Sequence, residues 1–500
     1  MKKIEKLMCI LLAGILCACS SDILDKNDPT KLNSGGFYRT ETQVEQAVVG
    51  VYSQLQEYIS NEAWQFGEMI SDNTTVHFDP MGRASAPANE AVEYWQLVSN
   101  TGNVGSLYNR MYRNLANINL ALYRMGAATV SETAKSNFEG QLRFMRAFYY
   151  FSLVQYFGDV IVVTEPITNP DQAWDYVRSP ISEVNILIDS DLKFAVEVLP
   201  AKNTKVGYAT KGAALMLQGR IFLARKQYVE AIATFRQITQ LGYQLLPDYA
   251  DVFDPAKKNH AESIMDVQFQ GGNDLGEHSG FLYNFYPRDS YGAVIPFPGR
   301  SGGGWNVPTL DIIGDYEEGD LRKAVSLKEG YTSNEGEWVA VPYINKYNHP
   351  HTIEGRPDDN WPLMRYAETL LSLAEAINET EGPTAEAFGY LNQIRQRAGL
   401  QPVSNLTKEE FRRVVFHERR IELAFENHRW LDLKRTMTPA ELAEFLNAYG
   451  VKEKSNPTTS RGTIPFNEYD FKFDSFEAYL PIPLRETRLN KNLRQNEGYE

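Results

Sequence analysis

Residues 209–241 read ATKGAALMLQGRIFLARKQYVEAIATFRQITQL, and this stretch says most about the architecture. Its small residues include Gly219 and Ala231, and its aromatic residues include Phe222 and Phe235. Small side chains let two helices approach closely, and aromatic rings fill the groove between them. The polar residues at positions 225–227 supply a turn in the middle of the stretch. We therefore predict a closely packed helical hairpin here.

The same four residues stand at the offsets where a tetratricopeptide (TPR) repeat places Gly, Tyr, Ala and Phe. A weaker copy begins at residue 365. Ala374 and Ile377 fit its first helix, and Ala387 and Leu391 fit its second helix with one residue inserted. Two degenerate hairpins predict a right-handed helical scaffold rather than a mixed α/β fold.

Apolar residues at spacings of three and four predict further helices on both sides of this hairpin. The expected helical segments are residues 40–55, 107–125, 138–157, 182–198, 363–379, 385–398 and 408–435. The expected fold class is mainly α: a TPR-like α–α superhelix of helical hairpins, with an irregular, loop-rich half.

The loop-rich half is expected at residues 242–362, which contain paired and tripled glycines and many Pro, Asn and Asp residues. A stretch of this length is too long to be one bare loop, so a few short strands are expected, for example at residues 263–269. The tail from residue 447 is expected to be irregular. TPR-like helices then occupy about 39–241 and 363–435 of a single domain, residues 39–500.

The N-terminus has the pattern of an export signal. Lys2, Lys3 and Lys6 precede a short apolar run that ends in Leu16-Cys17-Ala18-Cys19. The run is too short to span a bilayer as a helix. The pattern resembles a bacterial lipoprotein box, in which residues 1–18 are removed and Cys19 carries lipid, such as palmitate. Residues 20–38 would then form a flexible tether, and acyl chains at Cys19 would anchor the protein to a membrane.

The net charge and the cysteine content exclude some classes of partner and some sources of stability. The formal net charge is −14, and removal of residues 1–18 makes it −16. Such acidity argues against nucleic acid and against an anionic membrane surface as partners. Cys19 would be the only cysteine left, so no disulfide is expected. Stability must then come from a large packed core.

Several motifs, in order along the chain, carry a resemblance to one family. They are RAFYYF at 146–151 with FGDV at 157–160, RYAE at 365–368, NQIRQRAG at 392–399, ERRIELAFE at 418–426, RWLDLKR at 429–435, LPIP at 480–483 and QNEGY at 495–499. Together they resemble the SusD/RagB family of outer-membrane nutrient-binding lipoproteins. The resemblance covers nearly the whole mature chain.

The resemblance implies a lipoprotein on the surface of a Gram-negative outer membrane. It would bind a glycan, an oligosaccharide or polysaccharide, and deliver it to a SusC-like TonB-dependent transporter for nutrient uptake. The expected protein is not an enzyme and uses no cofactor. Three alternatives stay open: a lipid-anchored glycoside hydrolase, a RagB-like peptide-binding protein, and a scaffold of the same fold that binds only proteins.

The acidic residues Glu418, Glu422, Glu426 and Asp432 look at first like catalytic carboxylates. Arginines are interleaved with them in the same two motifs. Arginine–carboxylate pairs satisfy such a helical face when other helices pack over it. We therefore expect these acids to be structural, and no catalytic residue is predicted.

Sugars present apolar C–H faces and rings of hydroxyl groups, so aromatic and polar residues in loops are the better candidates. Starch-binding members of the family use an aromatic arc with an Asp, an Arg and an Asn beside it. By position the nearest counterparts are Trp95, Trp305 and Tyr291, followed by Asp72, Arg83 and Asn100. Further loop aromatics are Trp64, Tyr283 and Tyr286.

Signals for metals and nucleophiles are poor. His349-Pro350-His351 is the only close histidine pair, and its proline prevents a helical i, i+4 arrangement. The sequence contains no phosphate-binding loop and no Gly-x-Ser-x-Gly motif. No metal site is predicted, and no motif marks a calcium site among the loop aspartates.

Overall fold

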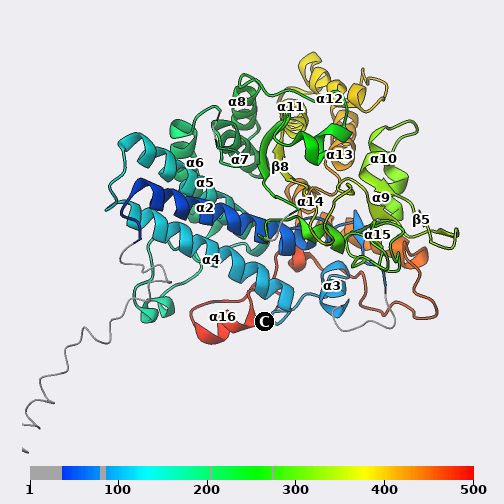
Figure 1. Cartoon of the computed structure of the whole chain (residues 1–500), viewed down its shortest axis with the longest axis horizontal. Coiled ribbons are helices and arrows are strands. Elements are labelled where there is room, and N and C mark those ends of the chain that lie inside the picture. Colours follow the sequence, from blue (N-terminus) through cyan, green and yellow to red (C-terminus); the bar gives the residue numbers. More distant parts are fainter. Residues whose placement is uncertain (1–36, 79–85, 203–204, 273–274, 500) are drawn as a thin grey trace, which may run out of the picture.

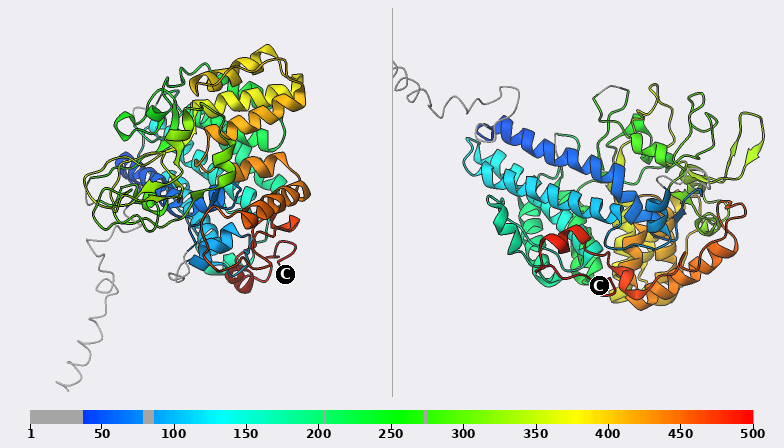
Figure 2. Two further views of the ribbon diagram at one scale, coloured as in Figure 1. Left: turned by 90° about the vertical axis from the view of Figure 1, so that its right-hand side faces the viewer. Right: turned by 90° about the horizontal axis from the view of Figure 1, so that it is seen from below.

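The structure is a computed structural model that describes residues 37–78, 86–202, 205–272 and 275–499. Its helices form a curved stack, and irregular loops gather at one end of the molecule (Figure 1; Figure 2, right). The stack follows chain order through α4 (Gly102–Met125), α5 (Glu132–Phe157), α6 (Ile181–Val198), α7 (Lys211–Ala224) and α8 (Tyr228–Ile238). The first helix, α2 (Glu41–Tyr58), packs across α4 and α5.

The predicted helical hairpin is present as α7 and α8. A Cβ added at Gly219 would lie 2.4 Å from the ring of Phe235, so only glycine permits this approach of the two helices. The second hairpin consists of α11 (Tyr366–Glu381) and α12 (Ala385–Arg397), followed by α13 (Lys408–Glu422). Because α8 packs on α11, the stack continues across a long insertion in the sequence. The mainly α fold class is confirmed.

The insertion leaves the stack after α8 and returns at α11 through two paired strands. These strands are β2 (Ser263–Val267) and β8 (Trp361–Arg365), which run antiparallel with Val267 opposite Trp361. They form the base of the loop-rich half, since the chain between them lies beyond this pair. That chain contains η7 (Gly280–Asn284), β3 (Val307–Pro308), α9 (Leu310–Asp315), α10 (Arg322–Ser326), β4 (Leu327–Lys328), β5 (Tyr331–Thr332), β6 (Trp338–Val339) and β7 (Tyr343–Ile344).

Three expected elements differ in the structure. Residues 363–365 are not helical but end strand β8, whose partner lies about a hundred residues upstream and leaves no local periodicity. The expected helix at 408–435 is two helices, α13 and α14 (Arg429–Thr436), because Phe425 and Asn427 between them have φ values of 65° and 66°. The irregular tail begins after residue 455 rather than at residue 447, because α15 (Pro439–Ser455) extends past the expected start of the tail.

Smaller elements complete the chain. Two π-helical segments, η2 (Ile59–Ala63) and η3 (Gln65–Met69), extend α2 and lead to β1 (Thr74–Thr75) and α3 (Ala86–Glu93). The other short helices are η4 (Pro170–Trp174), η5 (Ala250–Val252), η6 (Pro255–Lys257), η8 (Ser475–Ala478) and α16 (Leu484–Leu489).

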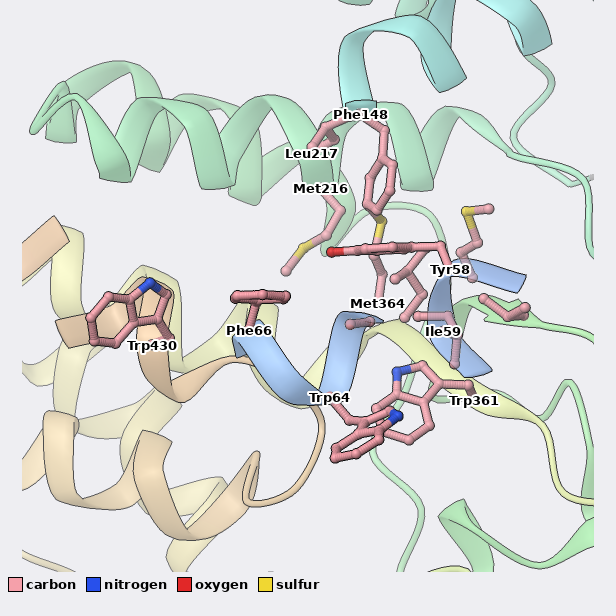
Figure 3. Packing of buried hydrophobic residues seen from close by; sticks show 14 of the residues in the cluster. Tyr58, Ile59, Trp64, Phe66, Phe148, Met216, Leu217, Trp361, Met364 and Trp430 are labelled. Carbon is pink, nitrogen blue, oxygen red and sulfur yellow. The ribbon is translucent and has the colours of Figure 1, made fainter. Parts of the chain in front are cut away.

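The core joins the two ends of the sequence. Tyr58 from α2, Phe148 from α5, Leu217 from α7, Trp361 from β8 and Trp430 from α14 all belong to one buried cluster (Figure 3). Because these residues come from distant segments, the stack and the insertion share a single apolar interior. In the part of the chain that the structure describes, no helix combines the length and the apolar character needed to cross a membrane.

Candidate functional site

The acids of the 418–432 motifs lie in a buried ion-pair network. Glu422 is 0% exposed and pairs with Arg365, Arg397 and Arg322. Burial alone would raise the pKa of Glu422, but these three guanidinium groups lower it well below its usual value. The arginine–carboxylate pairing expected from the sequence is therefore present at Glu422. A carboxylate whose oxygens all face arginines has no free position for a substrate.

Asp72 belongs to a second buried pair and does not face a ligand. Its carboxylate is 0% exposed and accepts two hydrogen bonds of 2.8 Å from Arg429. Arg420 lies 2.9 Å from the same carboxylate. Burial alone would raise the pKa of Asp72, but the two arginines hold it at about 2. We therefore remove Asp72 from the candidate site.

Trp95 is also buried, with 3% of its surface exposed. Its indole N–H donates to the carbonyl of Ile70 at 2.9 Å, and its ring packs against Phe471 and Phe473. The chain turns sharply at this residue, where φ is 58°, and the turn directs the ring inward. A ring enclosed in this way offers no face to a sugar, so its position does not fit ligand contact.

Trp64 and Tyr286 are buried for related reasons. Trp64 lies between η2 and η3 rather than in a loop, and its ring packs edge-on against Phe285. Tyr286 is 2% exposed and donates to the carbonyl of Tyr347. Neither ring is available at the surface, and both leave the candidate site.

The remaining aromatic candidates lie on one structural unit, which we call the 283–305 loop pair. In this unit residues 283–292 run beside residues 299–305. Backbone hydrogen bonds join them from Gly303 to Tyr283 (2.8 Å), from Trp305 to Asn284 (2.8 Å) and from Gly299 to Tyr291 (3.2 Å). The structure therefore places all three residues on one unit, with Tyr283 and Trp305 near one end and Tyr291 near the other.

The three consecutive glycines make this close approach possible. A Cβ added at Gly302 would lie 2.1 Å from the carbonyl oxygen of Tyr286, which is far inside van der Waals contact. Gly304 has a φ of 68°, a conformation that glycine adopts readily. The glycines thus fix the backbone that presents Trp305.

One part of the loop pair combines a ring with hydrogen-bonding groups. The guanidinium of Arg300 lies 5.5 Å from the ring centre of Tyr283 and pairs with Glu354 at 3.1 Å. The Tyr283 hydroxyl accepts a hydrogen bond from the Gly355 N–H and lies 2.7 Å from Nε2 of His351. Arg300 and Glu354 are both about half exposed, so they can reach hydroxyl groups of a ligand.

Two other residues of the loop pair present more ring surface than Tyr283, which is 8% exposed. Tyr291 is 59% exposed, and its φ of 44° holds it at a tight turn. Trp305 is half-buried, and the guanidinium of Arg288 lies 5.6 Å from its ring centre. Flat rings beside charged hydrogen-bond donors are suited to a sugar, whose C–H face stacks while its hydroxyl groups are bonded.

Three predicted residues do not join this unit. Asn100 is exposed, but it lines a separate groove between the start of α4 and α16. Figure 1 and the right view of Figure 2 both show α16 far from the β5–β6 hairpin. Arg83 and the lipidation candidate Cys19 lie outside the described residues.

Sequence reasoning missed Trp338, which is 63% exposed on the β5–β6 hairpin. This hairpin is attached to the loop pair, because Asn334 donates to the carbonyl of Tyr291 and Tyr331 donates to that of Asp289. A turn signal, Asn334-Glu335-Gly336, precedes the tryptophan and could have marked it.

In the described part of the chain, no group of three or more His, Cys, Asp or Glu side chains is arranged to hold a metal ion. His349 lies 2.5 Å from a carboxylate oxygen of Asp359, and His351 lies beside Tyr283. The His-Pro-His segment thus supports the loop pair through hydrogen bonds.

Comparison with known proteins places the chain among SusD-like proteins. The profile of the SusD family matches residues 315–499, and a profile described as starch-binding associating with outer membrane matches residues 22–223. The chain belongs to the SusD/RagB family. A SusD-like protein of Formosa agariphila, P2, is 27% identical to it, and the alignment covers 100% of each chain.

Solved structures of SusD-like proteins share the fold. One from Bacteroides fragilis superposes with a TM-score of 0.74 at 25% identity, covering 94% of this chain and 99% of that one. A laminarin-binding SusD-like protein superposes with a TM-score of 0.75 at 24% identity, covering 92% and 100%. In this SusD/RagB family member, the helical stack is therefore the shared frame that carries the 283–305 loop pair.

Proposed function

We propose that this protein binds a glycan at the 283–305 loop pair and does not cleave it. The observation that carries the proposal is the presence of the exposed Tyr291 and the half-buried Trp305 on one hydrogen-bonded unit with Arg288 and Arg300, while Tyr283 lies buried beside Arg300. A preformed surface of rings and charged donors binds sugars without the entropy cost of ordering a loop. The family description, starch-binding associating with outer membrane, supports the same ligand class.

Binding without hydrolysis is supported by the state of the acids. A glycoside hydrolase needs two carboxyl groups about 5–9.5 Å apart across a cleft, free to meet the substrate. Glu422 and Asp432 are instead engaged by buried arginines. We expect pure protein to leave oligosaccharides intact, as measured by chromatography of the products. Bond cleavage at a rate that follows enzyme concentration would overturn this part of the proposal.

The first prediction concerns the rings. Trp305→Ala and Tyr291→Ala should each weaken glycan binding by about 1–3 kcal/mol, the range found for aromatic stacking. Isothermal titration against a panel of neutral oligosaccharides, preceded by affinity electrophoresis on polysaccharides, measures the effect.

Tyr123→Ala is the matched control, because Tyr123 is a 61% exposed ring on α4 that lies outside the loop pair. It should bind the glycan as the unchanged protein does. Equal binding by Trp305→Ala, Tyr291→Ala and Tyr123→Ala would show that the ligand site is elsewhere. If only peptides bind, the ligand class is wrong although the surface is used.

We further propose that Cys19 carries lipid and holds the protein at the outer membrane, where it passes the glycan to a TonB-dependent transporter. Two or more acyl chains give firm anchoring, at about 0.8 kcal/mol for each buried CH₂ group. Cys19→Ala should move the protein from the membrane fraction to the soluble fraction. Co-purification of the native protein with a transporter tests the partner, and its absence under mild detergent would contradict the delivery step.

A further inference from the structure

A separate pocket lies on elements that contribute nothing to the 283–305 loop pair. Its volume is about 280 Å³, and its walls come from the end of α5, the start of α6, the turn between α7 and α8, the end of α14 and Tyr479. The elements α5, α6, α7 and α14 are visible in Figure 1, and α14 packs on α7. Five segments far apart in the sequence therefore meet at this pocket.

The charge of the wall is opposite to that of the chain. The whole chain has a net charge of −14, yet four of the residues that line the pocket are Arg225, Lys226, Lys434 and Arg435. No Asp or Glu belongs to the lining. Apolar side chains such as Phe151 and Val154 form the rest of the wall. In such surroundings a charge is screened less by water, and its attraction for an anion is stronger.

Two of the four cations have capacity left for a ligand. Arg225 uses Nη1 to pair with Asp189 at 2.9 Å, but its Nη2 is buried and has no hydrogen-bond partner. The ammonium of Lys434 donates to the carbonyl of Gln155 and lies 4.2 Å from the ring centre of Tyr479. Within the described residues, Lys434 forms no ion pair.

The other two cations of the pocket, Arg435 and Lys226, have less capacity left to bind a ligand. Arg435 is already engaged by Glu375 and Asp432 on its far side. Lys226 has a φ of 57° in the turn and lies at the rim, where Glu441 is the nearby carboxylate. Desolvation lowers the pKa of Lys434 to about 7, which is the expected state of a buried ammonium that lacks a counter-ion.

We infer that this pocket binds an oxyanion, a carboxylate, sulfate or phosphate group, through Nη2 of Arg225 and the ammonium of Lys434. A bound oxyanion would satisfy the buried N–H groups of Arg225 and supply the counter-ion that Lys434 lacks. Hydrogen bonds between charged partners are stronger than those between neutral ones. A free inorganic anion and the acid group of a charged sugar share this chemistry.

Titration calorimetry with sodium sulfate, sodium phosphate and sodium glucuronate, at an ionic strength held constant with sodium chloride, tests the inference. We expect saturable binding of at least one of them to the full protein. Tighter binding of sulfate or phosphate points to an inorganic anion or its ester, whereas tighter binding of glucuronate points to an acidic sugar.

Three variants test whether Lys434 and Arg225 bind the anion. Lys434→Gln and Arg225→Gln should each reduce the affinity at least tenfold, while Lys434→Arg keeps the charge and should retain binding. Arg236→Gln is the control. It removes one charge from α8, where Arg236 forms an exposed ion pair with Glu386 of α12. Melting temperatures in chloride alone confirm that each variant is folded. The inference is overturned if no anion binds saturably, or if the two glutamine variants bind as Arg236→Gln does.

The pH dependence gives an independent measurement. Sulfate keeps its charge between pH 6 and 8.5. The other charged side chains of the lining are Arg225, Lys226 and Arg435. Burial alone would lower the pKa of Arg435, but the carboxylates of Glu375 and Asp432 raise it further above its usual value. The pKa of Tyr479 is raised above 10, so its hydroxyl stays neutral, and the α5 and α6 lining residues are uncharged. Because Lys434 loses its proton across this range, sulfate should bind severalfold more tightly at pH 6 than at pH 8.5. Lys434→Arg should abolish this difference, and a pH dependence unchanged in Lys434→Arg would exclude Lys434 from the site.

Discussion

At the scale of single residues, many charged side chains of this protein are buried in ion pairs. Glu422 and Arg365 lie on different elements, and each is at most 1% exposed at its side chain. Lys346 and Glu426 extend the same network at 2.8 Å, again fully buried. Such groups are costly to remove from water, so each depends on the continued presence of its partners. The acids of the 418–426 motif therefore maintain the frame.

The second prediction follows from this network. Glu422→Ala should lower the free energy of unfolding by about 3–5 kcal/mol, because it leaves buried guanidinium groups without a counter-charge. Urea denaturation followed by circular dichroism measures it. Glu386→Ala breaks the exposed pair with Arg236 and should cost less than about 1 kcal/mol. Similar losses in both variants would show that burial does not decide the strength of these pairs.

Candidate residues for the proposed ligand site were harder to predict from the sequence than the buried ion pairs were. The aromatic content and the loop composition indicated which kind of residue to look for, and Tyr291 and Trp305 do lie on the loop surface. Trp95 looked equivalent in sequence, yet it is enclosed by Phe471 and Phe473, which come almost 400 residues later. Local sequence cannot show which distant segment will cover a ring.

At the scale of elements, glycines decide how closely segments pack. Gly219 allows α7 to pack closely against α8, and Gly302 allows the two segments of the loop pair to approach each other. Gly389 in α12 has open space around its Cα, so nothing in its surroundings requires a glycine. Helical glycines thus divide into those required by packing and those that only weaken the helix.

The third prediction compares two of these glycines. Gly219→Ala should destabilise the protein by about 1–3 kcal/mol, because its Cβ would overlap the ring of Phe235. Gly389→Ala should stabilise it by about 0.5–1 kcal/mol through better helix propensity. Thermal and urea unfolding measure both. If Gly219→Ala is also stabilising, the contact between α7 and α8 is looser than described.

The pairing of β2 with β8 is the element that sequence analysis could not supply. Helical periodicity predicted most of the stack correctly, from α2 to α13, because the apolar face of a helix is visible in the spacing of residues in its own sequence. A strand was expected at 263–269, where β2 lies, but its partner β8 is about a hundred residues away and its last residues were expected to begin a helix. The pairing closes the insertion where α8 packs on α11.

For the whole molecule, ion pairs connect the N-terminal third to the C-terminal third. Asp72 follows η3, whereas its partners Arg420 and Arg429 belong to α13 and α14. Trp64 and Phe66 belong to the same buried cluster as Trp430 (Figure 3). Buried ion pairs and a shared core therefore join the two ends of the chain.

The fourth prediction is a pH dependence of this connection. The pKa of Asp72 is held at about 2, below its usual 3.8, so the pair stabilises the fold fully above pH 4 and loses this stabilisation as the pH falls toward 2. The difference in unfolding free energy between the unchanged protein and Asp72→Asn should shrink by about 2 kcal/mol between pH 5 and pH 2. Urea titrations across this range measure it, and a constant difference would show that Asp72 is not paired.

The sequence by itself determined the helices, the close α7–α8 hairpin, the family and the structural use of the motif acids, because these depend on neighbours along one helix or on short motifs. Tertiary structure decided which aromatic rings remain at the surface, where the β2–β8 base forms, and that Arg225 and Lys434 share a pocket. These features depend on segments hundreds of residues apart, whose contacts are fixed only when the core closes.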